Sequence, residues 1–182
     1  MSPRRIRAAV ALALLLTMAG GTRAAAQDPL ELKVKAAFLF NFAKFTTWPA
    51  SKVKNADTTL YLCVLGDDAP LAKVLQDTVR GRNVGSHPID VLQAPRSEDL
   101  QRCHVVYLSP SNDGRIAQEL AALASHGVLT VHEGSEAQLG GVIRFLLSDS
   151  GRVRFEVNVT AASREQLALS SKLLEVSQVV NR

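Results

Sequence analysis

Two apolar runs decide the fold of this chain: LYLCVL at residues 60–65 and CHVVYL at residues 103–108. Each has the length and the apolar content of a strand that is buried on both faces of a sheet. Around them the sequence predicts helices near 70–80, 97–101 and 113–125 and further strands at 89–92 and 127–131. This alternation predicts an α/β fold: a mostly parallel sheet with helices on both faces, a three-layer sandwich.

The C-terminal third follows a different pattern. Apolar residues alternate with polar ones at Val153, Phe155, Val157 and Val159, as in a strand with one buried face. This strand follows the apolar run 142–147 and a Ser-Asp-Ser-Gly turn, so a β-hairpin is predicted. A last helix is expected over 161–179. Its buried stripe is expected to contain Leu169, Leu173, Val176 and Val180.

The first helix is expected over 30–45 and ends before Trp48-Pro49, because a residue that precedes proline disfavours helical geometry. Four of the six Phe residues and the only Trp lie in this region. A helix that is apolar nearly all round is either enclosed in a core or presents one face to a partner. Phe38, Phe42 and Trp48 are therefore candidate partner contacts as well as core residues.

The first 26 residues have the pattern of a secretory signal peptide. A basic stretch with Arg4, Arg5 and Arg7 precedes the apolar residues 8–19, and alanines 24–26 supply a cleavage site. The apolar stretch spans about 18 Å as a helix, which is too short for a hydrocarbon core of about 30 Å. We expect cleavage after Ala26, export to the bacterial periplasm without membrane insertion, and a single domain over 27–182.

The net charge of +4 also belongs to this leader. Four of the 21 basic residues precede Asp28, so the 17 that remain equal the 17 acidic residues. A neutral mature protein lacks the basic surface that nucleic acid requires. We expect partner recognition through shape, aromatic surface and a few fixed polar groups, with weak dependence on salt.

Cys63 and Cys103 are the only cysteines, and each lies in one of the two decisive runs. In an oxidising compartment an even pair favours a disulfide, although two separate buried thiols also fit the pattern. Their spacing matches neither a CxxC redox motif nor a zinc site, so catalysis by these cysteines is not expected.

The sequence shows no catalytic or metal-binding constellation. The four histidines lie in separate segments without the spacing of a metal site. No glycine-rich nucleotide loop follows a predicted strand, and Ser109 and Ser111 lack the context of a hydrolase nucleophile. Asp67-Asp68 resembles the acidic pocket of a receiver domain, but a solvated turn with a helix cap explains it better. We therefore expect no enzyme, no metal and no cofactor.

Polar residues of the C-terminal third are the remaining candidates for a recognition surface. Arg154, Glu156 and Asn158 share one side of a strand, where such side chains can hold a carboxylate or backbone groups. Ser171 and Lys172 lie on the predicted last helix. An exposed strand face with ordinary cross-strand pairs gives the same pattern.

Ordered blocks of the chain resemble the YfiR/HmsC-like family of bacterial periplasmic proteins. The blocks are KAAFLFNFAKF (35–45), WP (48–49), LCVLG (62–66), CHVV (103–106), GG (140–141), RFEVN (154–158) and LSSKLL (169–174). The resemblance covers about residues 31–180 and adds Asn41 to the candidate residues. It implies an α/β sandwich that forms homodimers, with Cys63 and Cys103 as the principal disulfide.

The resemblance also implies a function. Characterised members bind the periplasmic sensor domain of a membrane-bound diguanylate cyclase and keep cyclic-di-GMP, and hence biofilm formation, low. An outer-membrane partner can sequester such a repressor. The alternative is a periplasmic small-ligand-binding module in which Arg154, Glu156 and Lys172 face an aromatic-lined pocket.

Overall fold

The computed structural model describes residues 28–66, 68–94, 97–109, 113–133, 140–148 and 151–180. The expected leader and its cleavage site lie outside these residues. The helices are α2 (Pro29–Lys44), α3 (Ala69–Val79), α4 (Asp113–Leu123), α5 (Val159–Arg164), α6 (Ser171–Glu175) and the 3-10 helix η2 (Ser97–Arg102). The strands are β1 (Thr46–Thr47), β2 (Leu60–Leu65), β3 (Asn83–Val84), β4 (His87–Ala94), β5 (Val105–Leu108), β6 (Leu129–Glu133), β7 (Ile143–Leu147), β8 (Val153–Asn158), β9 (Ala168–Leu169) and β10 (Gln178–Val180).

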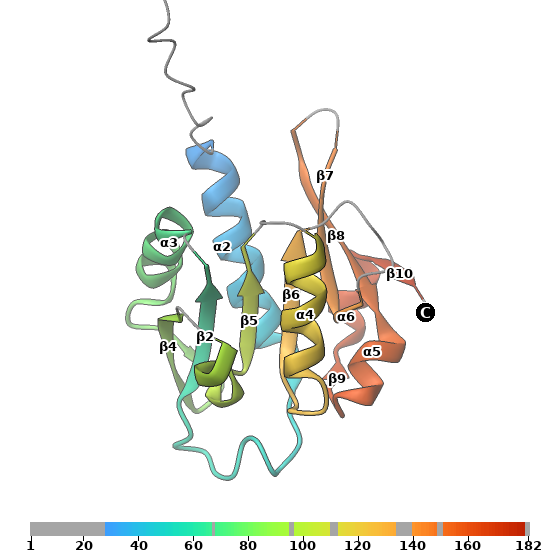
Figure 1. Ribbon diagram of the computed structural model, residues 1–182. Coiled ribbons are helices and arrows are strands. Elements are labelled where there is room, and N and C mark those ends of the chain that lie inside the picture. The colour runs from blue at the N-terminus through green and yellow to red at the C-terminus, as the bar shows by residue number, and fades with distance from the viewer. Residues whose placement is uncertain are drawn as a thin grey trace, which may run out of the picture.

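The main sheet has the strand order β10-β8-β7-β6-β5-β2-β4-β3 (Figure 1). Strands β4, β2, β5, β6 and β7 run parallel to one another. Strand β8 returns antiparallel beside β7 as the predicted hairpin, and β10 lies parallel to β8 at the edge. The mostly parallel sheet predicted from the alternation of strands and helices is confirmed.

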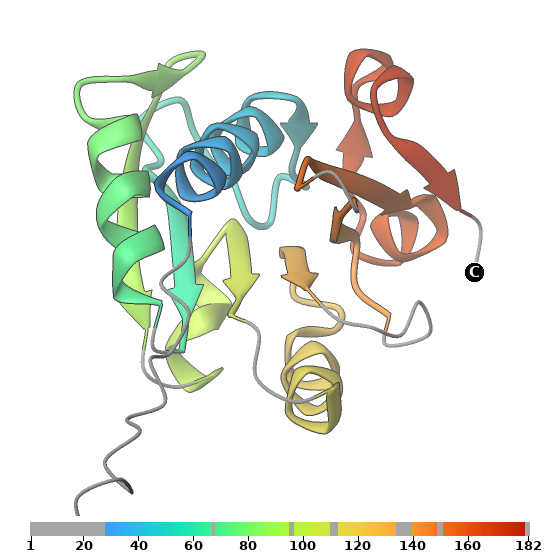
Figure 2. The ribbon, with the colours of Figure 1, turned by 90° about the horizontal axis from the view of Figure 1, so that it is seen from above.

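Helices cover both faces of this sheet, which makes the molecule a three-layer sandwich (Figure 2). On one face α2 and α3 pack through residues such as Leu39 and Leu71. On the other face η2 and α4 pack through residues such as Leu100 and Ile116. The central strands are buried on both faces, and this explains why they are apolar at nearly every position.

Aspartates start the first two helices. The Asp28 carboxylate accepts a hydrogen bond from the Leu30 amide at 2.8 Å, and Pro29 occupies the first helical position of α2. The Asp68 carboxylate accepts a bond from the Leu71 amide at 3.1 Å and caps α3. The interpretation of Asp68 as a helix cap is therefore confirmed, but the expectation of a solvated turn is wrong for Asp68, which is buried under the start of α3. Asp67 lies outside the described residues.

The prediction of one long final helix over 161–179 is wrong. Helix α5 ends at Arg164, Gln166 follows with a φ of 57°, and the chain then extends so that β9 pairs with β1. Helix α6 follows, and β10 joins the main sheet. Leu173 is buried as predicted, but Val176 is 71% exposed. Strand pairing with distant segments outweighs the helical periodicity of this region.

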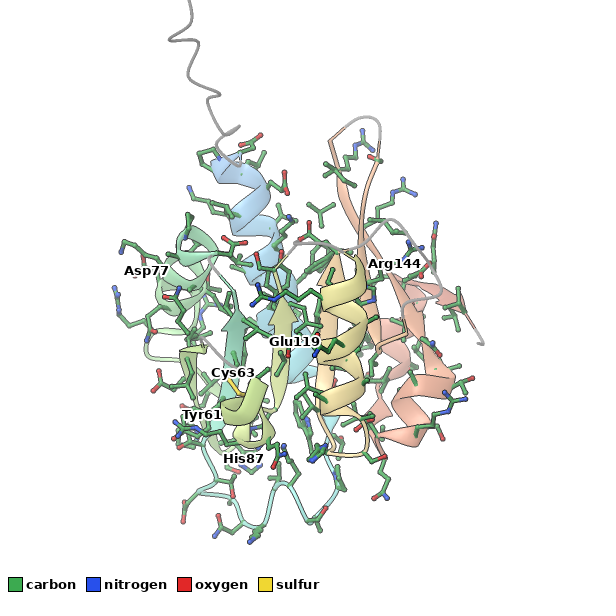
Figure 3. The ribbon with its side chains drawn as sticks, in the orientation of Figure 1. Tyr61, Cys63, Asp77, His87, Glu119 and Arg144 are labelled. Carbon is green, nitrogen blue, oxygen red and sulfur yellow. A yellow bond between two sulfur atoms is a disulfide. The ribbon has the colours of Figure 1, made fainter. Side chains whose placement is uncertain are left out.

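Cys63 in β2 and Cys103 just before β5 form a disulfide (Figure 3). The two strands are neighbours in the sheet, with Leu62 opposite Val105, so the Cα atoms of the cysteines lie 6.0 Å apart. The bond lies on the α4 side of the sheet and joins segments 40 residues apart. Disulfide pairing is confirmed over the alternative of two separate thiols.

Candidate functional site

The aromatic residues of α2 pack against the hairpin of β7 and β8. The Phe42 ring lies 4.9 Å from Phe155 and 5.7 Å from Phe145, measured between ring centroids. The Phe38 ring lies 5.2 Å from Phe155. Phe42 is fully buried, whereas Phe38 is half-buried. The cluster therefore fixes α2 to the hairpin, and of these two candidate residues only Phe38 reaches the surface.

Trp48 links the segment after α2 to the start of β5. Its indole Nε1 donates a hydrogen bond to the His104 carbonyl at 3.1 Å, and its ring meets the His104 imidazole edge to face. Trp48 is 8% exposed, so it belongs to the core of the monomer. Asn41, on the last turn of α2, is half-buried, and its carbonyl accepts a bond from the Phe45 amide.

His104 is a buried neutral histidine beside the disulfide. Its Nδ1 accepts a hydrogen bond from the Tyr61 amide at 3.1 Å, so the proton of the neutral ring is on Nε2. Burial, the nearby Lys52 ammonium and His87 lower the pKa of His104 to about 4. Lys52 itself donates to the carbonyls of Gln101 and His126, which ties the loop after β1 to η2 and to the turn between α4 and β6.

The three candidate residues of β8 lie in different surroundings although they share one side of the strand. Arg154 is exposed, and Glu156 is 6% exposed and accepts a hydrogen bond from the Arg144 guanidinium at 2.8 Å. Figure 3 labels Arg144 on the hairpin side of the molecule. The Asn158 carboxamide accepts a bond from the Ala161 amide and so caps α5. Glu156 and Asn158 therefore have local structural partners.

A cavity of about 10 Å³ lies beside this pair. It is lined by His132, Gly140, Gly141, Val142, Arg144, Glu156 and Asn158. A volume of this size corresponds to about one water molecule. The cavity therefore gives no support to the alternative in which Glu156 faces a pocket for a small organic ligand.

Ser171 and Lys172 lie at the start of α6, and both are exposed. The Ser170 hydroxyl caps this short helix by accepting a bond from the Lys172 amide. The structure thus places three of the candidate residues fully at the surface, namely Arg154, Ser171 and Lys172. Arg154 lies in β8, as the predicted strand requires. Ser171 and Lys172 lie in the short helix α6, where the sequence predicted one long helix.

A buried ion-pair cluster was not predicted from the sequence. Lys35 of α2 is 2% exposed, and its ammonium contacts Glu31 at 2.5 Å and Glu133 at 2.7 Å. The Tyr107 hydroxyl donates to the same Glu133 carboxylate. Burial lowers the pKa of Lys35, but its bonds to the two glutamates outweigh this and raise the pKa overall. A lysine on an otherwise apolar helix face, such as Lys35, is the feature of the sequence that indicates a buried ion pair, because lysine is rarely buried without a partner.

The cluster ties α2 to the carboxyl ends of β5 and β6. Burial, together with the Glu133 charge, raises the pKa of Tyr107, so its hydroxyl stays protonated and keeps donating. Each charged group of the cluster thus has a partner of opposite charge or a hydrogen bond. Within the described residues no group of His, Cys, Asp and Glu side chains is arranged to hold a metal ion.

The sequence pattern of the YfiR/HmsC-like family matches residues 32–178, which is most of the chain. The chain belongs to the YfiR/HmsC-like family. The match begins in α2 and ends in β10, so it includes the aromatic cluster, the disulfide and the hairpin. The members of this family are periplasmic regulators of diguanylate cyclases. The members themselves are regulators rather than enzymes. No helix among the described residues is long and apolar enough to cross a membrane.

Proposed function

We propose that this protein represses a membrane-bound diguanylate cyclase by binding the periplasmic sensor domain of that enzyme. Membership of the YfiR/HmsC-like family over residues 32–178 carries the proposal. Binding to the inactive form of the sensor shifts its conformational equilibrium toward that form. Cyclic-di-GMP, and with it biofilm formation, then stays low.

The proposed location follows from the sequence of the leader. Cleavage after Ala26 releases a protein with equal numbers of basic and acidic residues into the periplasm. The Cys63–Cys103 disulfide is compatible with that oxidising compartment. The proposed assembly is a homodimer, and an outer-membrane protein relieves repression by sequestering it.

The proposed contact surface lies on the C-terminal third. Ser171 and Lys172 offer a hydroxyl and a cation, and the nearby Val176 and Val179 are 71% and 48% exposed. Exposed apolar residues beside a few fixed polar groups are typical of a protein interface. Phe42 and Trp48 are buried in the core of the monomer, so they stabilise the fold and are not available as direct partner contacts.

Deleting the gene tests the regulatory role. Cyclic-di-GMP measured in cell extracts should rise, and expression of the wild-type protein from a plasmid should restore the low level. The purified protein should also retain the sensor domain of the cyclase in a pull-down. An unchanged cyclic-di-GMP level together with no recovered cyclase would contradict the proposal.

The surface assignment needs a matched pair of variants. Lys172→Glu reverses a charge on the proposed surface, whereas Lys54→Glu makes the same change at an exposed lysine of the loop after β1. Lys172→Glu should weaken sensor retention about tenfold, as expected for an interface charge worth about 1.4 kcal/mol. Lys54→Glu should bind like the wild type. Equal binding by both variants would remove α6 from the interface.

A further inference from the structure

The strap, residues 49–59, joins β1 to β2 and passes beneath the strands in Figure 1. Among the described residues its backbone hydrogen bonds stay within the strap, so no strand ladder holds it to the sheet. Side chains make its bonds to neighbouring segments. Lys52, for example, donates to the carbonyls of Gln101 and His126. A segment held in this way can open locally at a lower free-energy cost than the whole fold.

The His104 ring lies where both ends of the strap meet the sheet. Its Nδ1 accepts a hydrogen bond from the Tyr61 amide at 3.1 Å, as a backbone carbonyl does elsewhere in the sheet. The His104 carbonyl accepts the bond from the Trp48 indole, also at 3.1 Å. The ring and the indole meet edge to face, with 5.6 Å between their centroids. One histidine therefore joins the residue before the strap to the start of β2.

A proton on Nδ1 of His104 is incompatible with this arrangement. Nδ1 then becomes a donor that faces the Tyr61 amide, which is a donor as well. Nε2 offers no compensation, because it is buried and has no hydrogen-bond partner among the described residues. The protonated ring thus loses a bond and gains none while the strap is closed. Movement of the ring into water relieves this conflict.

The charges around the ring also oppose the proton. The neighbouring elements carry the titratable side chains of Lys52 in the strap, His87 in β4, Arg102 in η2 and His126 in the turn after α4. Burial, together with the charges of Lys52 and His87, lowers the pKa of His104, although the Lys52 carbonyl favours the proton. The acidic residue of this region is Glu165, which acts on Lys52 and is bound to two backbone amides.

We propose that acid opens the strap while the rest of the fold stays intact, and that the His104 imidazole is the group that takes up the proton. The ring leaves its place between Trp48 and Tyr61, and the strap separates from the ends of the strands. The bond from His87 to the Thr58 carbonyl is not the trigger, because its N–H can donate in either protonation state. This opening does not depend on the proposed regulation of the cyclase.

The difference in proton affinity between the closed and the open strap sets the size of the effect. The ring has its ordinary pKa of 6.5 when the strap is open, whereas burial and the Lys52 charge lower the pKa to about 4 when it is closed. The open state therefore binds more protons between pH 6.5 and 4. The ratio of open to closed molecules should rise about 100-fold from pH 7 to pH 4 and stay nearly constant above pH 6.5.

Native-state hydrogen exchange measures the opening at two protons. The Tyr61 amide and the N–H of Trp48, the only Trp in the chain, should both lose protection about 100-fold from pH 7 to pH 4, after correction for intrinsic exchange rates. Low concentrations of urea should leave both rates unchanged, because a local opening exposes little surface. The amides of β5 and β6 should exchange more slowly and respond to urea. If Tyr61 exchanged at the rate and with the urea dependence of those amides, unfolding would be global and the proposal overturned.

The variants His104→Gln and His87→Gln identify the group that is protonated. Glutamine keeps an acceptor for the Tyr61 amide but takes up no proton, so the protection of Tyr61 in His104→Gln should be the same at pH 7 and pH 4. His87→Gln should keep the 100-fold response. A response that persists in His104→Gln, or that is lost in His87→Gln, would contradict the proposed role of His104.

A second pair of variants tests whether the strap opens as a unit. Lys52→Met removes the bonds to two carbonyls, so the Tyr61 amide should already lose protection about tenfold at pH 7, as expected for one or more lost hydrogen bonds. Lys54→Met, at an exposed lysine of the strap, should leave this protection unchanged. Equal protection of Tyr61 in both variants would show that the strap does not control access to the ring.

Discussion

Lys35 shows how a single charged residue positions a helix. Its ammonium lies between Glu31 and Glu133 and is nearly excluded from solvent. The cost of burying it is offset by two charge-assisted hydrogen bonds, and the second glutamate is fixed in turn by Tyr107. The Lys35–Glu133 pair therefore joins α2 to the end of β6, while apolar packing supplies most of the stability.

Replacing Lys35 by Met should destabilise the protein by about 3–5 kcal/mol, because it leaves two glutamates partly buried without their cation. Lys33→Met, at an exposed lysine of the same helix, should change stability by less than about 0.5 kcal/mol. Urea unfolding gives both values. Adding Glu133→Gln to Lys35→Met should restore part of the loss, and strictly additive effects would show that the two groups are not coupled.

His104 makes the stability of the fold depend on pH. Its ring stays neutral in the folded protein down to about pH 4, whereas the unfolded chain takes up a proton below its ordinary pKa of 6.5. The unfolded state therefore binds more protons between pH 6.5 and 4, and acid favours unfolding in that window. Above pH 6.5 this contribution is constant.

The expected loss from His104 between pH 7 and pH 4 is at most about 3 kcal/mol of unfolding free energy. Urea titrations at pH 7, 5.5 and 4 measure it. His104→Gln, which keeps an acceptor for the Tyr61 amide, should flatten the dependence, and His126→Gln at an exposed position should not. A wild-type slope that persists in His104→Gln would assign the acid sensitivity to other groups.

At the scale of elements, Glu165 joins the end of α5 to the turn between α4 and β6. Its carboxylate accepts bonds from the Ser125 amide at 2.7 Å and the Gly127 amide at 2.9 Å. Both residues have positive φ angles, so the turn has an unfavourable backbone conformation at Ser125 that these bonds support. A contact between segments about 40 residues apart thus shapes a local turn.

Glu165→Gln should cost about 1–3 kcal/mol, because the amide replaces a charged acceptor and retains only one acceptor oxygen. Hydrogen exchange at the Ser125 and Gly127 amides should accelerate in the variant. Glu175→Gln, at an exposed position of α6, serves as the control and should leave both the stability and these exchange rates unchanged. Unaltered exchange at Ser125 in Glu165→Gln would mean that another group holds the turn.

For the whole molecule, the disulfide joins two neighbouring strands of the parallel part of the sheet, β2 and β5. It closes a loop that contains α3, the β3–β4 pair and η2, because the two cysteines are 40 positions apart in the chain. The loop restricts the unfolded chain more than it strengthens the folded one, and in the chain-entropy model a loop of this length contributes roughly 4 kcal/mol.

The variant with Cys63→Ala and Cys103→Ala should lose roughly 4 kcal/mol of unfolding free energy. Its circular dichroism spectrum at low temperature should match that of the wild type, because both positions stay apolar. Treating the wild type with reductant should give a similar loss, whereas the variant should be insensitive to reductant. A variant as stable as the oxidised protein would show that the loop entropy is offset elsewhere.

The parallel sheet and its two helical layers could be predicted from the sequence. Strands that are buried on both faces, such as 60–65 and 103–108, are apolar at nearly every position, and this composition is visible in the sequence. The same reasoning failed for 161–179. Leu169 and Leu173 have helical spacing, but Ser170 donates its amide to the Phe45 carbonyl and Leu169 pairs with Thr46. Because these partners are so distant in the chain, the residues around 169 show no local pattern that predicts the pairing.

The candidate site could be predicted only in part. Arg154, Ser171 and Lys172 lie at the surface, but Phe42, Trp48 and Glu156 are buried. Periodicity assigns a residue to one side of a strand, and it does not reveal whether another element covers that side. The hairpin partner Arg144 accounts for the burial of Glu156, and α2 with the hairpin accounts for Phe42.

The sequence by itself determined the layered α/β architecture and the family, and it favoured a disulfide between the only two cysteines in the chain. These properties depend on composition, local periodicity and the order of motifs along the chain. Only the tertiary structure decided that Lys35 is enclosed by Glu31 and Glu133 and that the final segment is broken into α5, β9, α6 and β10. These properties depend on contacts between segments far apart in the chain, and the energy of such contacts is absent from any local pattern.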